Sequence, residues 1–414
     1  MKTVVLDDDP TGTQSSAGVT VLLESSADIL TDALHDNDSV YVQTNSRAID
    51  EHDAVALVRR VRADALEAAA RNDADVRFVL RGDSTLRGHV FAESEVFAAE
   101  NSIIVFVPAF PDGGRTTIDG VHRVLIDGRQ VPADQTEYAQ DPVFPFAHGR
   151  LDDYVAEKSD RPAVLVPLAD VRGGAMAGIL RDVAPRSVVL PDVADNTDID
   201  LIAEAITAAQ LAGRDIVVRC GAPLAAALAG VRSNGLLTTP LVTAPRATLL
   251  VCGSHTNGAT RQLVPIIAAW GEPAVVDTEL ALSDSAAAGD DVAAAASAQL
   301  NDRGLAIIMS ERTRSSEHNT LEHGRRVMEA LTAAVGTIAP KVDVVVAKGG
   351  ITSADVARIG LGARTARVLG QVLPGISVWE LQAYDGHQVL YVVVPGNVGG
   401  PDTLTKVLAA VGYR

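Results

Sequence analysis

Three adjacent carboxylates, Asp7, Asp8 and Asp9, stand near the start of the chain, directly after a short apolar stretch at residues 3–6. This stretch has the pattern of a buried strand. Carboxylates this close together favour a bound cation, a shared proton or a solvated loop. Ligands of parallel α/β sheets bind at the carboxyl ends of the strands. We therefore interpret the cluster as a site for a small ligand, Mg²⁺ or a general base; the alternative is a solvated acidic turn.

Two later loops combine arginine, aspartate and hydroxyl side chains. Residues 81–89 follow the apolar stretch 76–80, and residues 108–117 follow the apolar run 103–107. A guanidinium fork binds two oxygens of a carboxylate or phosphate, and an aspartate among hydroxyls suits a polyol or a proton acceptor. The alternative is an Arg–Asp pair that only braces a turn. The predicted substrate-binding residues are Asp8, Arg81, Asp83, Ser84, Arg87, Asp112, Gly113 and Arg115, and the candidate catalytic carboxylates are Asp83, Asp8 and Asp9.

A glycine turn at residues 348–353 lies between a β-branched run and a helical pattern. Thr352 and Asp355 have the spacing of a capping box, so we expect a helix to begin there. Such a turn aims backbone N–H groups and the positive end of a helix dipole at one point, which suits a phosphate. Lys348 would add a mobile positive charge. The alternative is a capped helix after a tight turn.

Two more glycine loops follow apolar runs, at residues 253–260 and 395–402. The first has the Gly-x-x-x-x-Gly spacing of a Walker A motif, but Ala259 stands where the lysine would be. Three such loops in one half of the chain favour a nucleotide phosphate site over three unrelated turns. The predicted nucleotide-binding residues are Ser254, Lys348, Gly349, Gly350, Ile351, Thr352, Ser353, Gly396, Asn397 and Gly399.

Composition excludes several classes of partner. The 414 residues carry 53 acidic and 35 basic side chains, a net charge of −18, which disfavours nucleic-acid or anionic-membrane binding. The two cysteines, Cys220 and Cys252, are too far apart for a Cys-x-x-Cys site. No signal-peptide pattern or membrane-length apolar run occurs, so we expect a cytoplasmic protein without a membrane partner. The oligomeric state stays open, with a homodimer as one option.

Strand-like and helix-like stretches alternate along most of the chain, which is typical of a parallel α/β sheet. Length and an apolar fraction of 47% favour two domains. Residues 233–246 contain Gly235, Pro240 and Pro245 and few periodic positions. We predict an N-terminal domain over residues 1–235, a linker over 236–246 and a C-terminal domain over 247–414. Each would hold a largely parallel sheet flanked by helices, with the active site in the cleft between the domains.

The two halves together suit phosphoryl transfer. The N-terminal half offers arginines, aspartates and hydroxyls for a small polar anion, and the C-terminal half offers glycine loops for a polyphosphate. The reaction needs alignment, charge neutralisation and a base near the accepting hydroxyl. An aspartate would be the base, while Lys348, loop N–H groups and Mg²⁺ would offset phosphate charge.

On these motifs the chain resembles the four-carbon acid sugar kinases. The matching segments are residues 8–12 (Asp-Asp-Pro-Thr-Gly), 81–88 (Arg-Gly-Asp-Ser-Thr-Leu-Arg-Gly), 108–111 (Pro-Ala-Phe-Pro), 114–117 (Gly-Arg-Thr-Thr), 253–254 (Gly-Ser), 348–353 (Lys-Gly-Gly-Ile-Thr-Ser) and 395–400 (Pro-Gly-Asn-Val-Gly-Gly).

The resemblance implies ATP-dependent phosphorylation of a four-carbon sugar acid such as D-threonate, D-erythronate or a 3-oxo-tetronate. It also implies an N-terminal substrate domain and a C-terminal nucleotide domain, with Ser254, the 349–353 loop and Gly396 at ATP. One departure is Pro10, because better-known members have a hydrophobic residue there, so the substrate within the class stays open.

Two other readings compete. Residues 5–11 fit the Asp-x-Asp-x-Thr motif of haloacid-dehalogenase-type phosphatases, with Asp7 or Asp9 as nucleophile. That reading predicts phosphate release without ATP and gives the glycine loops no purpose. A non-catalytic sugar-acid-binding protein would bind ligand without turnover. An NAD enzyme is disfavoured because no Gly-x-Gly-x-x-Gly follows the first strand.

Overall fold

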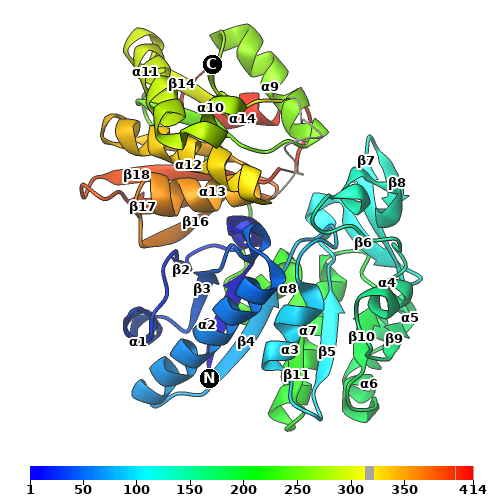
Figure 1. Cartoon of the computed structure of the whole chain (residues 1–414). Coiled ribbons are helices and arrows are strands. Elements are labelled where there is room, and N and C mark those ends of the chain that lie inside the picture. The colour runs from blue at the N-terminus through cyan, green and yellow to red at the C-terminus, as the bar shows by residue number, and fades with distance from the viewer. Residues whose placement is uncertain (313–320, 397, 414) are drawn as a thin grey trace. The chain divides into compact units, whose positions relative to one another are not determined.

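The computed structural model describes residues 1–312, 321–396 and 398–413, without the side chain of Leu321. The chain forms two compact units (Figure 1). Unit 1 comprises residues 1–8 and 25–232, and unit 2 comprises residues 9–24 and 233–414. The domains at residues 1–235 and 247–414 and the linker at 236–246 concern function, and they stay a prediction.

Unit 1 is built on a parallel sheet with the strand order β3-β1-β4-β11-β5-β10-β9. Continuous apolar runs make these strands, as expected where a parallel sheet is covered on both faces. The strands are β1 (Lys2–Asp7), β3 (Ser39–Gln43), β4 (Val76–Arg81), β5 (Ile103–Val107), β9 (Ala163–Val166), β10 (Val188–Pro191) and β11 (Ile216–Cys220). Their carboxyl ends therefore bring separate loops to one edge of the sheet.

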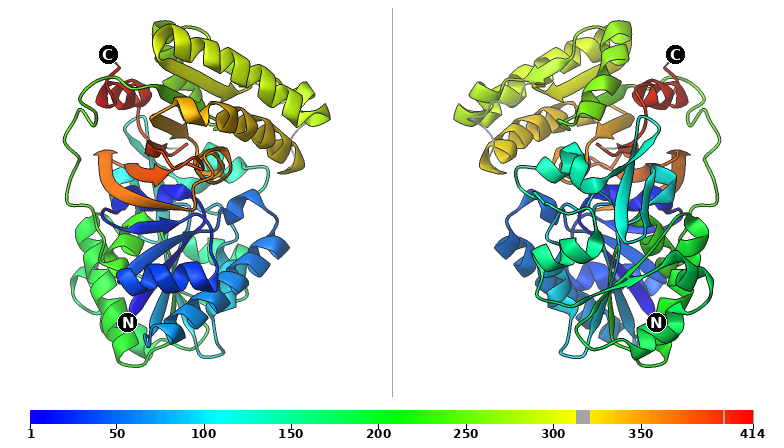
Figure 2. Two further views of the ribbon diagram at one scale, coloured as in Figure 1. Left: turned by 90° about the vertical axis from the view of Figure 1, so that its left-hand side faces the viewer. Right: turned by 90° about the vertical axis from the view of Figure 1, so that its right-hand side faces the viewer.

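Helices cover both faces of this sheet (Figures 1 and 2). On one face α1, α2 and α3 pack in series, and on the other α6, α7 and α8 do so. The helices of unit 1 are α1 (Ala27–Asp36), α2 (Glu51–Arg71), α3 (Val90–Phe97), α4 (Leu151–Lys158), α5 (Leu168–Arg172), α6 (Met176–Asp182), α7 (Asn196–Leu211) and α8 (Ala222–Ala229).

A small antiparallel sheet follows β5 in the chain. It has the order β6-β7-β8, with β6 at Arg115–Ile118, β7 at Val121–Ile126 and β8 at Arg129–Pro132. Thr117 on β6 pairs with His122 on β7. This sheet carries Arg115 at the start of β6 and His122 on β7. His122 contacts the loop that follows β4.

Unit 2 has a mixed sheet with the order β13-β14-β12-β15-β18-β17-β16-β2. The first five strands are parallel, and the last three pair antiparallel. They are β2 (Thr20–Leu22), β12 (Thr248–Cys252), β13 (Ala274–Val276), β14 (Leu305–Ser310), β15 (Val344–Lys348), β16 (Thr365–Leu373), β17 (Ile376–Gln382) and β18 (Gln388–Val394).

Helices α9 and α14 pack over one apolar core of this sheet, while α10, α11 and α12 contact one another. The helices are α9 (Asn257–Trp270), α10 (Thr278–Ser283), α11 (Ser285–Arg303), α12 (Leu321–Ile338), α13 (Gly350–Asp355) and α14 (Thr403–Ala410). The predicted α/β class with helix-flanked, largely parallel sheets is confirmed. Among the described residues no helix is long and apolar enough to cross a membrane.

The segment after the acidic cluster is anchored within unit 2. Its 3-10 helix Pro10–Ser15 buries Thr13, whose hydroxyl accepts a hydrogen bond from Trp379 Nε1 at 2.9 Å. Strand β2 then pairs with β16, and Glu24 forms an ion pair with Arg364 at 3.0 Å. The Asp-Asp-Asp sequence is therefore divided: Asp7 and Asp8 belong to unit 1, and Asp9 belongs to unit 2.

Candidate functional site

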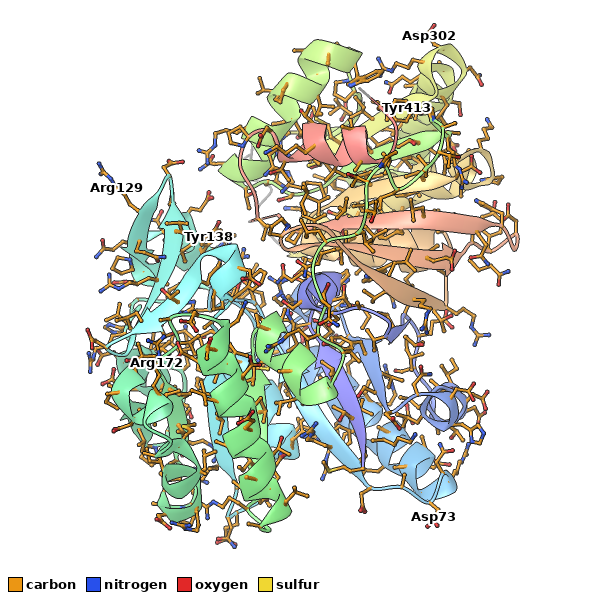
Figure 3. The ribbon with its side chains drawn as sticks, turned by 180° about the vertical axis from the view of Figure 1, so that it is seen from behind. Asp73, Arg129, Tyr138, Arg172, Asp302 and Tyr413 are labelled. Carbon is orange, nitrogen blue, oxygen red and sulfur yellow. The ribbon has the colours of Figure 1, made fainter. Side chains whose placement is uncertain are left out.

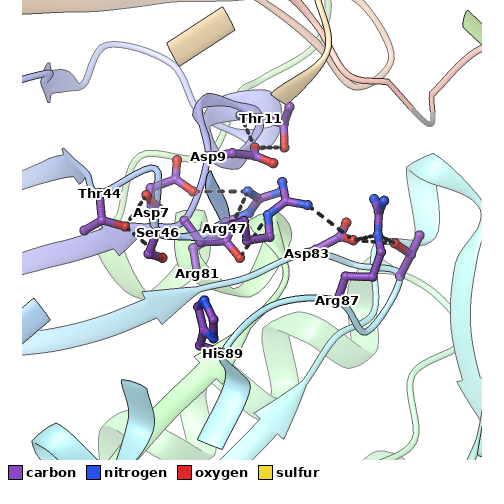
Figure 4. A network of polar contacts seen from close by, with 12 residues as sticks. Asp7, Asp9, Thr11, Thr44, Ser46, Arg47, Arg81, Asp83, Arg87 and His89 are labelled. Carbon is purple, nitrogen blue, oxygen red and sulfur yellow. Dashed lines mark hydrogen bonds and ion pairs between the residues drawn. The ribbon is translucent and has the colours of Figure 1, made fainter. Parts of the chain in front are cut away.

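Arg81 organises the acidic cluster in unit 1. Strands β1 and β4 are in parallel register, which sets Asp7 opposite Arg81 at their carboxyl ends. Arg81 Nη1 lies 3.1 Å from Asp7 Oδ1 and 3.2 Å from Asp8 Oδ1, and all three side chains are buried (Figure 4). One guanidinium thus bridges two neighbouring carboxylates and offsets their repulsion.

Two further arginines approach the second oxygen of Asp8. Arg219 Nη2, from β11, lies 3.4 Å from Asp8 Oδ2, and Arg47 Nε lies 3.5 Å from the same oxygen. Arg219 is itself held by the buried carboxylate of Glu93 on α3. All the ion-pair distances of Asp8 fall between 3.2 and 3.5 Å, longer than a well-formed charged hydrogen bond. Asp8 is surrounded by positive charge but not tightly bonded by it.

Asp83 is bonded more tightly. Its Oδ2 accepts from Arg87 Nε at 2.8 Å and from the hydroxyl of Thr85, and Arg47 Nη1 lies 3.6 Å away (Figure 4). Burial alone would raise the pKa of this carboxyl, but Arg87, Arg47 and Thr85 together hold it well below its usual range. Asp83 is therefore ionised at neutral pH and resists protonation.

The environment of Asp7 has the opposite effect. Burial raises the pKa of Asp7 from 3.8 to about 7; Arg81 opposes this rise and Asp8 adds to it. Asp7 Oδ2 is buried and has no hydrogen-bond partner among the described residues. Asp7 therefore keeps its proton to a higher pH than an ordinary carboxyl does, whereas Asp83 loses its proton more readily.

Aromatic and acidic groups hold Arg87 and Arg115. The Arg87 guanidinium lies over the ring of Tyr138, 5.2 Å from its centroid, and Nη1 is 3.3 Å from Asp141 Oδ2. Tyr138 is labelled in Figure 3. Burial lowers the pKa of Arg115, and the neighbouring Tyr138 and Asp83 oppose that effect. Two cations from different chain segments, Arg87 and Arg115, therefore lie near Asp83.

The structure brings some of the predicted substrate-binding residues together. Asp8 shares Arg47 with Asp83, and the ion pairs of Arg81 and Arg87 join the same network. Arg115 lies near Asp83, whereas Asp112 and Gly113 have other partners. Asp112 is exposed and accepts a hydrogen bond from Asn196 at the start of α7, and Gly113 accepts one from Arg115.

Ser84 and Asp9 have structural bonds of their own. Ser84 contributes its carbonyl oxygen to a hydrogen bond with His122. Asp9 Oδ1 caps the 3-10 helix of unit 2, accepting from Thr11 N at 2.7 Å and from the Thr11 hydroxyl. The catalytic role expected for Asp9 stays a prediction.

Sequence reasoning missed Arg47, Glu93, Tyr138, Asp141 and Arg219. Arg47 has a local signal, because it lies in a polar loop after a strand as Arg81 does. Glu93 and Arg219 have none, because one lies in a helix and the other inside an apolar strand. Their contact depends on β11 lying beside β4, which spacing in the sequence does not reveal.

The glycine loops of unit 2 converge on one another. A Cβ placed on Gly396 would lie 2.7 Å from Ser254 Oγ, and one on Gly349 would lie 3.1 Å from Ser254 Cβ. A Cβ on Gly253 would lie 2.4 Å from Thr352 Oγ1. Three loops thus meet, with glycine on one side of each contact and the Ser254 or Thr352 side chain on the other. A glycine is needed at each of these positions because a larger residue would crowd its neighbour.

Side-chain hydrogen bonds hold the backbone of these loops. The Thr256 hydroxyl donates to the Gly396 carbonyl at 2.8 Å and caps α9 by accepting from Ala259 N. Arg312, which sequence reasoning also missed, donates to the Ser254 carbonyl at 2.5 Å and to Thr260 Oγ1 at 2.7 Å. Arg312 follows β14, so its only sequence signal is a charged residue after a strand end.

Two expectations about the 348–353 turn are wrong. The helix begins at Gly350 with Gly349 as its N-cap, so Thr352 lies inside the helix and forms no capping box with Asp355. Lys348 is not a mobile charge, because it is fully buried and donates to the Pro395 carbonyl at 2.6 Å. Burial lowers the pKa of Lys348 to about 8.

The remaining predicted nucleotide residues differ in position. Ser353 Oγ donates to the Gly349 carbonyl at 2.7 Å, so its hydroxyl serves the turn itself. Ile351 is half-buried in the first turn of α13. Gly399 packs against Thr403 of α14, and its carbonyl accepts from Gln262 of α9. Asn397 lies outside the described residues.

Two family models match the chain. Residues 3–228 match the model described as "Sugar-binding N-terminal domain", and residues 249–404 match that described as "Nucleotide-binding C-terminal domain". The guanidinium–carboxylate cluster lies within the first range and the glycine loops within the second.

Curated relatives are similar over different shares of the chain. A D-threonate kinase of Salmonella typhimurium is 25% identical over 99% of this chain and 98% of its own. A D-erythronate kinase of Heliobacterium modesticaldum is 33% identical over 55% of this chain and 49% of its own. A 3-oxo-tetronate kinase of Cupriavidus necator is 26% identical over 80% of this chain and 77% of its own.

Two solved structures share the fold. A protein of Haemophilus influenzae has a TM-score of 0.60 at 19% identity and covers 98% of this chain and 99% of its own. A protein of Salmonella typhimurium LT2 has a TM-score of 0.63 at 17% identity and covers 98% of each chain. At these identities the likeness concerns the fold alone.

Replacing Gly349 by alanine should impair nucleotide binding. Gly349 has a φ of +119°, and the added Cβ would press on Thr352 Oγ1 at 3.0 Å and on Ser254. We expect Kd for ATP, measured by isothermal titration calorimetry, to rise by about tenfold or more. Gly258→Ala is the matched control, because its Cβ would meet nothing closer than 3.8 Å. Equal Kd values for the two variants would contradict the placement of ATP at this turn.

Asp7→Asn should flatten the pH dependence of stability. Between pH 3.8 and about 7 the folded chain keeps the Asp7 proton that the unfolded chain releases, so this group lowers stability as pH rises. The wild type should therefore lose more unfolding free energy than the variant between pH 4.5 and 7.5, on the order of a few kcal/mol. Urea unfolding followed by circular dichroism measures this. Parallel profiles would contradict the buried, protonated state.

The two tryptophans provide an internal control for that experiment. Trp270 and Trp379 both lie in unit 2, so their fluorescence reports the unfolding of that unit. The Asp7→Asn change should leave the pH dependence of the fluorescence transition unaltered.

Proposed function

We propose that this chain, which belongs to the four-carbon acid sugar kinase family, transfers the γ-phosphoryl group of ATP to a hydroxyl of a four-carbon sugar acid. The observation that carries the proposal is the buried network in which Arg47 joins Asp8 to Asp83 within the matched sugar-binding domain. The relatives named as D-threonate, D-erythronate and 3-oxo-tetronate kinases support the substrate class.

The chemistry of the cluster fits a small hydroxylated carboxylate. Arginine side chains bind a carboxylate through paired N–H donors. Arg87 and Arg115 stand next to Asp83, so they are the proposed partners of the substrate carboxylate. Ionised Asp83 would then accept a hydrogen bond from a substrate hydroxyl and fix its orientation.

Asp8 is the proposed general base. During transfer a bond forms between the substrate oxygen and the γ-phosphorus, the bond to the ADP oxygen breaks, and the hydroxyl proton passes to a carboxylate. Asp83 is poorly suited to take that proton because its guanidinium and hydroxyl partners depress its pKa. The ion pairs of Asp8 with described residues are long, at 3.2 to 3.5 Å, so its oxygens keep acceptor capacity.

The converging glycine loops are the proposed phosphate cradle. Gly349 and Gly396 approach Ser254 so closely that a Cβ on either would crowd its side chain, and backbone N–H groups at the start of α13 suit an anion. Buried Lys348 would act by holding the Pro395 carbonyl and by adding positive charge below its pKa of about 8.

Mg²⁺ belongs to the same proposal. When bound, it would neutralise charge on the β- and γ-phosphates. The described carboxylates near the glycine loops, Asp355 and Asp402, face Arg358 and Lys406. Phosphate oxygens and water are therefore the proposed main ligands of the ion, as is common for Mg²⁺.

The phosphatase reading is less favoured by the site. A nucleophilic aspartate must be ionised and must have an oxygen that can attack, whereas the pKa of Asp7 is raised and Asp9 caps a 3-10 helix. A non-catalytic binding protein is distinguished by turnover alone.

ADP release across a panel of acids tests the proposed function. The enzyme would be assayed with ATP and Mg²⁺ against D-threonate, D-erythronate and a 3-oxo-tetronate, with each acid omitted in turn. We expect acid-dependent ADP release with at least one of them. A second assay would offer a sugar-acid phosphate without ATP. Phosphate release in that assay, together with no ADP release in the first, would favour the phosphatase hypothesis. Binding of an acid without either product would favour the non-catalytic reading.

Asp8→Asn and Asp83→Asn should fail in different ways. Loss of the base in Asp8→Asn should lower kcat by about 10²- to 10⁴-fold while ATP still binds. Asp83→Asn should mainly raise KM for the sugar acid, because an amide cannot hold Arg87 as a carboxylate does. Steady-state kinetics separate the two. If instead Asp83→Asn lost kcat and Asp8→Asn kept it, Asp83 would be the base.

A further inference from the structure

His122 lies deep in unit 1 and connects the small antiparallel sheet to the loop that carries Asp83. The residue is fully buried on β7, opposite Thr117 of β6. Its Nε2 is 2.9 Å from the Ser84 carbonyl oxygen, and its Nδ1 is 3.0 Å from Thr117 Oγ1. Ser84 directly follows Asp83, so the imidazole contacts the backbone of the proposed substrate loop.

The two partners determine one state of the ring. A carbonyl oxygen only accepts, so Nε2 must carry the hydrogen and donate to Ser84. In a neutral ring Nδ1 then accepts from the Thr117 hydroxyl. Burial, with help from Arg115 and against the Ser84 carbonyl, lowers the pKa of His122 to about 4. The ring is therefore neutral and fixed in one tautomer at neutral pH.

The loop held by His122 has a strained backbone. Leu86 has a φ of +69°, which non-glycine residues seldom adopt, and its side chain is buried. The Leu86 carbonyl accepts a hydrogen bond from the Tyr154 hydroxyl at 2.8 Å. His122 and Tyr154 thus form hydrogen bonds with the carbonyl groups on either side of Thr85. The Thr85 hydroxyl in turn donates to Asp83. Such outside support is what keeps an unfavourable loop conformation populated.

We propose that His122 is a positioning residue that holds the Asp83–Arg87 loop in the geometry that binds the sugar acid. The inference rests on the proposed function of that loop. His122 would act through the Ser84 carbonyl and not touch the substrate. Removing the Nε2 donor would leave a buried carbonyl without its partner and let Asp83 and Arg87 shift together.

The alternative role for His122 is that of an ordinary buried residue that only stabilises the fold. The two roles differ in what a side-chain amide can replace. Glutamine carries an N–H donor at about the reach of imidazole Nε2, whereas leucine carries none. A positioning role therefore predicts rescue by His122→Gln, and a purely structural role predicts similar kinetics for any folded variant.

Steady-state kinetics of His122→Leu, His122→Gln and Ser94→Ala test the proposal. Ser94 is a matched control, because it is buried in unit 1 and its hydroxyl bonds only the local Val90 carbonyl. For His122→Leu we expect kcat/KM for the sugar acid to fall about 10- to 100-fold, with KM for ATP within about twofold of wild type. His122→Gln should recover most of the loss, and Ser94→Ala should resemble wild type.

Several results would overturn the proposal. They are equal impairment of the leucine and glutamine variants, a matching rise in KM for ATP, or an unchanged kcat/KM in His122→Leu. If His122→Leu fails to fold, Thr117→Val carries the test, because it removes the donor to Nδ1 and keeps the ring. A Thr117→Val enzyme with wild-type kcat/KM would then overturn the proposal.

Hydrogen–deuterium exchange separates this inference from the proposed function. In the unliganded protein, amides of residues 84–88 should exchange faster in His122→Leu than in Ser94→Ala, whatever the substrate is. Absence of turnover in the wild type with every acid would defeat the proposed function while this readout still reports the loop. Unchanged exchange would show that His122 does not hold the loop.

Discussion

The site in unit 1 depends on one buried ion cluster, in which the Arg81 guanidinium bridges Asp7 and Asp8. Three carboxylates in a row at a strand end would repel one another, and burial would make that repulsion larger. The parallel register of β1 and β4 places Arg81 opposite Asp7, which turns an unfavourable sequence into a paired cluster. The other ion pairs of the site connect to this pairing. Arg219 and Arg47 both approach Asp8, and Arg47 also approaches Asp83.

The cluster also gives neighbouring carboxylates different properties. Asp7 has few compensating partners and its pKa rises to about 7, whereas cations and a hydroxyl hold that of Asp83 far below its ordinary value. Groups whose environments push their pKa values apart can take different roles in one site. Unit 2 uses another principle. Its glycine loops approach one another closely, with the Ser254 and Thr352 side chains at the contacts and no ion cluster like that of unit 1 among the contacts described for these loops.

Local patterns in the sequence were enough for the fold class, the loops at strand ends and the family resemblance. They failed where a property depends on the packing of distant segments. Lys348 follows a strand as a phosphate-binding lysine would, but β18 and its following loop enclose it, so it is not mobile. Thr352 has capping spacing, but a helix that begins at Gly350 places it in the interior. Arg219 stands inside an apolar strand and Glu93 in a helix, and only the packing of these elements reveals that Glu93 holds Arg219 and that Arg219 approaches Asp8.

The central claim is that the chain moves a phosphoryl group from ATP to a sugar acid. Phosphorus-31 NMR of a reaction containing the protein, ATP, Mg²⁺ and the best acid tests it most directly, because it observes the fate of the γ-phosphorus. We expect a phosphomonoester signal that grows in step with ADP, with little inorganic phosphate. Inorganic phosphate in step with ADP, or no change in the γ-phosphate signal with any acid, would contradict it.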